Sequence, residues 1–141
     1  EGVPNHLGGS HRKDLWRERY RSIGNLERHL HANGTRILKF FLHISKAEQK
    51  KRFLARIDDP EKNWKFGTAD MQERAFWDDY QYAYEQCLRA TSTKTAPWYV
   101  IPADRKWYRN LLITRIVLNT LKEMNPQYPH VSFDPLEVEI K

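Results

Sequence analysis

The stretch TRILKFFLHISKAEQKKR, residues 35–52, contains the two patterns that decide the fold. Its first ten residues are rich in β-branched and aromatic side chains, and their apolar run is nearly continuous. Such a run is typical of a strand covered on both faces, as in a parallel sheet. Ser45 and Glu48 then have the spacing of a capping box, which marks the start of a helix. The stretch therefore predicts a strand over residues 35–44 and a helix that ends at about Ile57.

The same alternation of helix and strand continues on both sides of this stretch. Apolar residues that recur every three or four positions predict the other helices, and WYVIPA predicts a second buried strand. The expected order begins with an irregular segment over 1–13, a helix over about 14–31, the strand over 35–44 and the helix that ends near 57. A loop over about 56–68 and a helix over about 69–90 follow. The chain then forms the second strand over 98–103, a helix over 106–124 and an irregular tail over 125–141. The third helix is expected to turn Ala75, Phe76, Tyr80, Ala83, Tyr84 and Leu88 inward.

This order predicts the fold class α/β. Strands that alternate with helices favour right-handed crossovers and a parallel sheet with helices on both faces. Because two strands make a poor sheet, we interpret residues 14–124 as the second half of a doubly wound fold, with the first half missing.

Composition narrows the class of protein. The chain has 141 residues, 40% hydrophobic and 13% aromatic, which predicts one globular domain with a substantial core. Lys and Arg number 24 against 18 for Asp and Glu, so the formal charge is +6 and a polyanionic partner is favoured. A single cysteine, Cys87, excludes an internal disulfide and fits a reducing compartment. With no long apolar run and no signal-like start, we expect a soluble, cytoplasmic protein without a membrane partner.

Cations gather after both predicted strands. In an open α/β sheet, ligands bind beyond the carboxyl ends of the strands, and both segments that leave those ends are basic. The first carries Lys46, Lys50, Arg52 and Arg56, the second carries Arg105, Lys106 and Arg109, and Lys62 and Lys65 in the loop extend the row. Arg binds phosphate oxygens with two parallel hydrogen bonds and Lys adds a mobile charge. The pattern predicts a site for an extended phosphate chain.

Simpler interpretations stay open at several of these positions. A basic run on a helix is often only a solvated face, and Trp64 in RIDDPEKNWKF (56–66) is either a cap for the core or a surface for stacking a base. Asp58 and Asp59 either turn the chain before a proline or pair with Arg56. Asp104 is either functional or a cap for the last helix.

Several catalytic motifs are absent from the sequence. It has no nucleophile elbow, and its histidines and single cysteine have no spacing for zinc. The six glycines do not form the phosphate-binding loop G-x-x-x-x-G-K-[ST] of a P-loop kinase.

Four motifs together resemble one family. They are GT-x-x-LKFFLHISK-x-EQ (34–49), R-x-DDPEKNWKF (56–66), WDDY-x-x-AYE (77–85) and ATST-x-x-APWYVIPAD-x-KW (90–107). In combination they are specific, and over residues 14–121 the chain is similar to the C-terminal portion of the polyphosphate kinase type 2 family. The resemblance implies a P-loop kinase fold like that of thymidylate kinase, with the Walker A half missing from this chain.

The resemblance also implies a reaction and a site. Family members move a phosphoryl group between inorganic polyphosphate and a nucleoside mono- or diphosphate such as AMP, ADP or GDP, with Mg²⁺ whose ligands are expected outside this chain. The loop over about 56–68 would be a lid that closes over phosphates and excludes water. The implied roles are catalysis for Arg56, phosphate binding for Arg52, Lys62, Lys65, Lys46, Arg105 and Lys106, and lid or nucleotide contacts for Asn63, Trp64 and Asp104.

Two other functions remain as alternatives. One is a non-catalytic module that binds RNA or polyphosphate, using basic clusters beside Trp64, Trp107 and Tyr108. The other is a structural role in a homo-oligomer, with Tyr80 and Tyr84 at the interface. The resemblance favours the phosphotransferase, for which a homo-oligomer is expected and nucleic acid is not.

Overall fold

The computed structural model describes residues 9–132 and residue 134. Its elements are α1 (Gly9–Ala32), β1 (Lys39–His43), α2 (Lys46–Ile57), the short 3-10 helix η1 (Asn63–Lys65), α3 (Thr68–Arg74), α4 (Trp77–Thr91), β2 (Trp98–Pro102) and α5 (Lys106–Met124). The predicted irregular ends lie partly outside the described residues. Residues 9–13, predicted to be irregular, instead form the first turns of α1, and residues 125–132 form neither helix nor strand.

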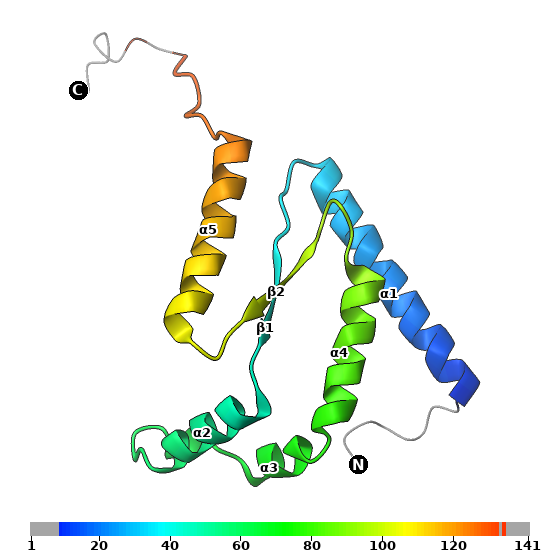
Figure 1. Cartoon of the computed structure of the whole chain (residues 1–141). Helices are drawn as coiled ribbons and strands as arrows, with labels where there is room; N and C mark the ends of the chain where they lie inside the picture. Colours follow the sequence, from blue (N-terminus) through cyan, green and yellow to red (C-terminus); the bar gives the residue numbers. More distant parts are fainter. Residues whose placement is uncertain (1–8, 133, 135–141) are drawn as a thin grey trace, which may run out of the picture.

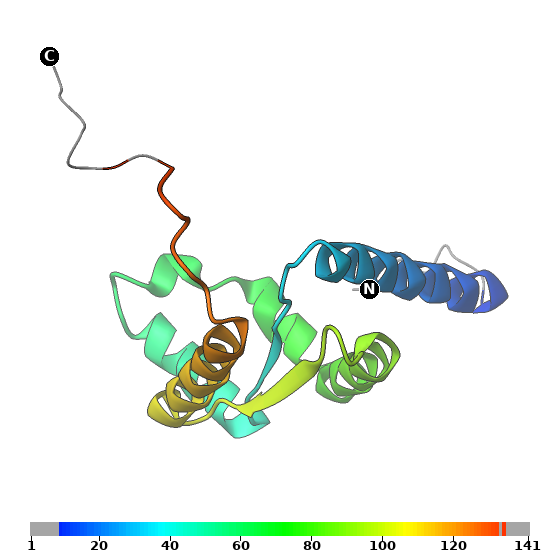
Figure 2. The ribbon, with the colours of Figure 1, turned by 90° about the horizontal axis from the view of Figure 1, so that it is seen from above.

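The two strands form a parallel sheet, as the alternation of elements predicts. Their register runs from Lys39 opposite Trp98 to His43 opposite Pro102. In Figure 1, α5 lies on one side of the strands, and α4 and α1 lie on the other. Figure 2 shows the same separation from above, with α1 outermost beyond α4. The α/β class with flanking helices is therefore confirmed.

Local signals explain where several helices begin and end. The Ser45 hydroxyl accepts a hydrogen bond from the Glu48 N–H at 3.1 Å, which confirms the Ser45 half of the predicted capping box. The other half does not form, because the Ser45 N–H donates to Asp104 and the Glu48 carboxylate accepts from Arg52. After α1, Gly34 has a φ of 85°, a left-handed conformation that favours glycine and stops the helix where the sequence predicts. α5 ends in the same way at Asn125, whose φ is 42°.

The single helix predicted over residues 69–90 is wrong, because the chain forms α3 and α4 instead. The N–H groups of Ala75 and Phe76 donate to the carbonyl oxygens three residues earlier, Gln72 and Glu73, at 3.0 and 3.1 Å. These tight bonds end α3, and Phe76, with φ −89° and ψ 26°, leaves the helical conformation before α4 begins. The apolar spacing runs through this break, so the sequence pattern contains no sign of it.

The substantial core predicted from composition is not present in the described part of the chain. Only Ala96, Ile101 and Ala103 are buried apolar residues there. Three side chains predicted to face inward from the third helix, Phe76, Tyr80 and Tyr84, are at least 40% exposed. A sheet of two strands has too little surface to cover these helices on its own.

A polar network joins α1 to both strands. The Lys39 ammonium donates to the two carboxylate oxygens of Glu27 at 2.7 and 2.9 Å and to the Thr91 carbonyl oxygen at 2.7 Å. The Trp98 indole N–H donates to the Thr91 hydroxyl at 2.8 Å, and its ring lies 5.3 Å from the Lys39 ammonium. Because Glu27 is buried, losing Lys39 would leave an unpaired carboxylate in the protein interior.

Candidate phosphate-binding rim and lid

The ends of β1 and β2 are joined by hydrogen bonds. The Ala103 N–H donates to the His43 carbonyl oxygen at 2.8 Å, which extends the sheet by one residue. Two residues beyond His43 and one beyond Ala103, the Ser45 N–H donates to the Asp104 carboxylate at 2.8 Å. This bond from the Ser45 backbone is the main reason that the pKa of Asp104 lies below its usual range, and the nearby Arg52 adds to it. Asp104 is therefore an ionised tie between the two turns and not a cap for α5, whose start has no side-chain cap.

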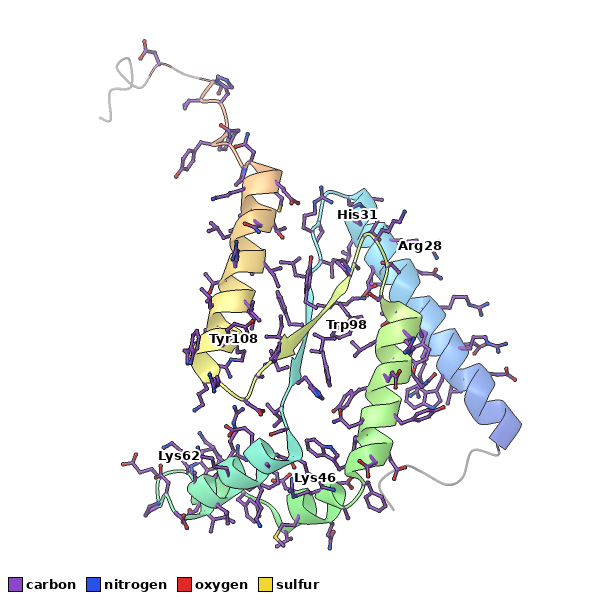
Figure 3. The ribbon with its side chains drawn as sticks, viewed as in Figure 1. Arg28, His31, Lys46, Lys62, Trp98 and Tyr108 are labelled. Atoms are coloured by element: carbon purple, nitrogen blue, oxygen red, sulfur yellow. The ribbon has the colours of Figure 1, made fainter. Side chains whose placement is uncertain are left out.

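An open cleft lies against this joined edge, where the sequence predicts a ligand site. Its volume is about 330 Å³, and it is lined by His43, Ser45, Pro102, Ala103, Asp104, Arg105 and Tyr108. Figure 3 shows Tyr108 on the first turn of α5, beside the end of β2. Sequence reasoning did not single out His43, and it named Tyr108 only for the alternative function of RNA binding. The sequence signal for both residues is their position. His43 is the last residue of β1, and Tyr108 lies in the first turn of α5, the helix that follows β2.

The predicted rim cations fall into two groups. Arg105 lines the cleft, and Lys106 and Lys46 are exposed at the first positions of α5 and α2. Lys62 belongs to the other group, at the far end of α2 from Lys46 (Figure 3). A helix of this length spans roughly 18 Å at 1.5 Å per residue, so the two groups suit different parts of one long ligand.

Arg52 takes a different position from the one predicted. Its Nη2 donates to the carbonyl oxygens of Ala103 and Asp104 at 2.7 and 3.3 Å, and its Nε donates to the Glu48 carboxylate at 2.8 Å. Because Arg52 and Arg56 are four residues apart on one helix, their spacing alone would place both side chains on the same face, toward the loop. Instead the Arg56 guanidinium lies 5.8 Å from the Phe53 ring, so the two arginines diverge.

The residues predicted to form the lid make a turn that is stabilised by their own hydrogen bonds. The Asp59 carboxylate accepts from the Glu61 N–H at 3.0 Å and pairs with the Lys62 ammonium, and this pairing is the main cause that lowers the pKa of Asp59. Asp59 therefore turns the chain, as one of the two interpretations held, and its ionic partner is Lys62 and not Arg56.

Trp64 stands at the surface of the lid. Its indole N–H donates to the Glu61 carbonyl oxygen at 3.0 Å, the Lys65 ammonium lies 5.0 Å from its ring, and 75% of the residue is exposed. The interpretation of Trp64 as a cap for the core is wrong. Asn63 begins η1 beside it and is also exposed.

The described residues do not fit a resident metal ion. No group of three or more His, Cys, Asp or Glu side chains in that part of the chain is placed to hold one. We therefore derive no step through a metal bound by these residues. Nor does any helix there have the length and apolar character needed to cross a bilayer.

Comparisons with known proteins identify the family of the chain. Residues 5–129 match the family model described as Polyphosphate kinase 2. The chain belongs to this family. The resemblance drawn from the four motifs is thereby confirmed.

Curated relatives and a solved structure agree with the family match. The chain is 56% identical over 132 residues to an ADP-polyphosphate phosphotransferase of Rhodopseudomonas palustris, covering 94% of this chain and 45% of the relative. It is 54% identical over 117 residues to an AMP/ADP-polyphosphate phosphotransferase of Meiothermus ruber, covering 83% and 44%. The crystal structure of Polyphosphate Kinase 2 from Arthrobacter aurescens TC1 matches with a TM-score of 0.80 at 44% identity, covering 84% of this chain and 42% of that one. The chain thus spans less than half the length of these relatives.

Proposed function

We propose that this chain takes part in phosphoryl transfer between inorganic polyphosphate and a nucleoside mono- or diphosphate, and that it supplies the lid and the basic rim. The single observation that carries the proposal is the cleft at the joined ends of β1 and β2, with Arg105 in its wall and the lid attached to the same edge through α2. The names of the R. palustris and M. ruber relatives support polyphosphate and adenine nucleotides as the substrates.

The proposed reaction is a direct in-line transfer. A terminal phosphate oxygen of the nucleotide attacks the last phosphorus of polyphosphate. The bond from that phosphorus to its bridging oxygen breaks, and the shortened polyphosphate leaves with the electron pair. No covalent bond to the protein forms, so the protein contributes positioning and positive charge.

The proposed roles follow the two groups of cations. Lys46, Arg105 and Lys106 bind phosphates at the rim, where the exposed side chains are free to adjust to a chain of repeating units. Lys62 and Lys65 bind phosphates from the lid, and Arg56 stabilises the charge on the transferred group. Trp64 and Asn63 contact the nucleotide and cover it. Arg52 is predicted to bind phosphate as well, but its Nε and Nη2 already donate to acceptors within the protein.

The proposed fold is the carboxyl-terminal part of a P-loop kinase. The match to the A. aurescens structure, which covers 42% of that chain, supports this proposal. On this proposal the phosphate-binding loop and the ligands of Mg²⁺ belong to the portion of the family fold that these residues do not include.

The test is ATP formation from long-chain polyphosphate, ADP and Mg²⁺ by a chimera. The chimera joins this chain to the part of the R. palustris relative that it does not match. We expect ATP, and we expect Arg105→Ala in the chimera to raise the KM for polyphosphate at least about fivefold, because one charged contact is lost. If the chimera is active and Arg105→Ala leaves its KM for polyphosphate unchanged, the cleft is not part of the polyphosphate site.

A second candidate function rests on exposed aromatic side chains near the cations. Trp64 on the lid and Trp107 on α5 are 75% and 63% exposed, which suits stacking of unpaired bases. A module that binds single-stranded RNA would bind any sequence, with an affinity that falls steeply as salt rises. Fluorescence titration of the chain with oligouridylate at two salt concentrations tests it, and an absence of binding at low salt would exclude it.

A further inference from the structure

The first turns of α2 are held from both sides by two arginines. Arg52 points from α2 toward the end of β2, where it bonds the carbonyl oxygens of Ala103 and Asp104. Arg74, the last residue of α3, points back at the start of α2. Its Nη1 donates to the Lys46 carbonyl oxygen at 2.9 Å and to the Gln49 side-chain oxygen at 2.6 Å. These bonds join segments separated by 25 to 52 positions along the chain.

The two arginines therefore hold the two helices that flank the lid. The lid segment, residues 58–67, leaves from the end of α2 and returns into α3. Arg52 connects α2, the helix before the lid, to the end of β2. Arg74 connects α3, the helix after the lid, to the start of α2. The bond between Ser45 and Asp104 secures the same turn of α2 on the cleft side. Within the described residues, the lid tip is held mainly by its own turn, while its base is bonded to the rim.

Both guanidinium groups are engaged with protein acceptors. The Arg52 side chain is 27% exposed and donates from Nε and Nη2, and Arg74 is half-buried with Nη1 shared between two oxygens. The Arg52 bonds come from two nitrogens, Nε and Nη2, of one planar group, a spread of donors that a single ammonium group does not reproduce. An arginine that binds phosphate, by contrast, would need these donors free. Lys could replace such an arginine in part, because Lys also binds phosphate.

We propose that Arg52 and Arg74 are positioning residues that set the base of the lid against the cleft, so that the lid cations meet the phosphates in one fixed register. The inference rests on the proposed function and deepens it. It reassigns Arg52 from phosphate binding to positioning, and it adds Arg74, which the sequence motifs did not single out.

The bonds that Arg52 and Arg74 make to the β2 end and to α2 are called the clamp. The first experiment tests the clamp without any assay of activity. Amide hydrogen exchange is measured on the 141-residue chain and on its variants Arg52→Lys and Arg74→Lys. We expect exchange in the first turns of α2 and across residues 58–67 to quicken about tenfold in both variants, because local opening becomes easier. Arg89→Lys is the matched control, since Arg89 is 73% exposed and pairs only with Glu85 on its own helix. Unchanged exchange in both clamp variants would overturn the proposal.

A milder variant separates loss of the clamp from general unfolding of the chain. Gln49→Ala removes one acceptor of Arg74 and leaves both arginines in place. We expect the same segments to exchange about threefold faster, with circular dichroism unchanged. If Arg74→Lys unfolds the chain, this variant decides the matter, and an exchange rate equal to that of the parent would contradict the clamp.

The second experiment separates positioning from phosphate binding in the active chimera. We expect Arg52→Lys and Arg74→Lys to lower kcat at least about tenfold while the KM for polyphosphate changes less than twofold. We also expect more phosphoryl groups to reach water, because the lid closes in the wrong place. A raised KM with kcat kept would make these arginines phosphate ligands and overturn the proposal. A parent chimera without transfer would contradict the proposed function and the catalytic part of this inference, while hydrogen exchange still decides whether the clamp exists.

Discussion

Asp104 joins the ends of the two strands through one carboxylate. Its bond from the Ser45 N–H joins the turn after β1 to the turn after β2, and Arg52 lies close enough to favour the ionised form further. Sequence reasoning singled out Asp104 from its place at a strand end. It could not predict the partner, because Ser45 is 59 positions away and meets Asp104 only through the parallel pairing of the strands.

Asp104 also makes the stability of the chain depend on pH. Because the pKa of Asp104 is lowered in the folded state, its contribution to the free energy of unfolding is present above the pKa of the unfolded state, about 3.9. That contribution is lost as the pH falls through the folded-state pKa. Asp104→Asn keeps an acceptor for Ser45 and removes the charge. We expect the variant to be less stable than the parent at pH 7, with the difference shrinking below pH 4, as measured by urea unfolding across that range.

Two features keep this comparison specific. Asp59 also has a lowered pKa, and since it is present in both proteins its effect cancels in the difference. Asp14→Asn, an exposed change on α1, is the control for the loss of one negative charge. A gap between parent and Asp104→Asn that stays constant down to the lowest pH would contradict the assignment.

At the scale of the elements, local chemistry predicted α2 and failed for α3 and α4. The cap of α2 is encoded by Ser45 and Glu48, which lie three residues apart, so the sequence contains the whole signal. Arg74, the last residue of α3, bonds the Lys46 carbonyl oxygen of α2, 28 residues away. Such a contact leaves no trace in the periodicity of apolar residues, and the pattern alone predicted one long helix.

The lid is the element whose cations the proposed mechanism uses most directly. Arg56 lies where α2 passes into the lid, and its guanidinium rests over the Phe53 ring, a contact that a phosphate could replace. We expect Arg56→Ala to lower kcat in the chimera at least about tenfold, because charge on the transferred phosphoryl group loses a stabilising donor. Arg89→Ala on α4 is the matched control. Unchanged kinetics in Arg56→Ala would exclude Arg56 from the site.

At the scale of the whole molecule, the sequence predicted the topology and not the core. The order of elements and the rule for parallel crossovers were enough for a parallel pair with helices on both sides. The apolar residues were counted correctly, but counting does not show what covers them. Leu42 and Val100 in the strands and Leu111 and Leu118 on α5 are all exposed in the described structure. This surface agrees with a chain that spans less than half the length of its relatives.

The exposed apolar surface predicts that the chain becomes more stable when it is joined to the rest of the fold in the chimera. The 141-residue chain should bind the dye ANS strongly, and the chimera should bind less dye per molecule and unfold at a higher urea concentration, because more apolar area is removed from water. Native mass spectrometry of the chain alone provides the control, since self-association through Tyr80 and Tyr84 would also cover apolar surface. A monomeric chain with weak dye binding would contradict this prediction.

The most direct test of the account compares ATP formation by the 141-residue chain and by the chimera, from the same polyphosphate, ADP and Mg²⁺. We predict no ATP above background from the chain alone, because its described residues offer a lid and a rim without a metal site, and ATP from the chimera. An inactive but folded chimera, or a chain that forms ATP by itself at the same rate as the chimera, would contradict the claim that these residues supply the lid and basic rim of a larger phosphotransferase.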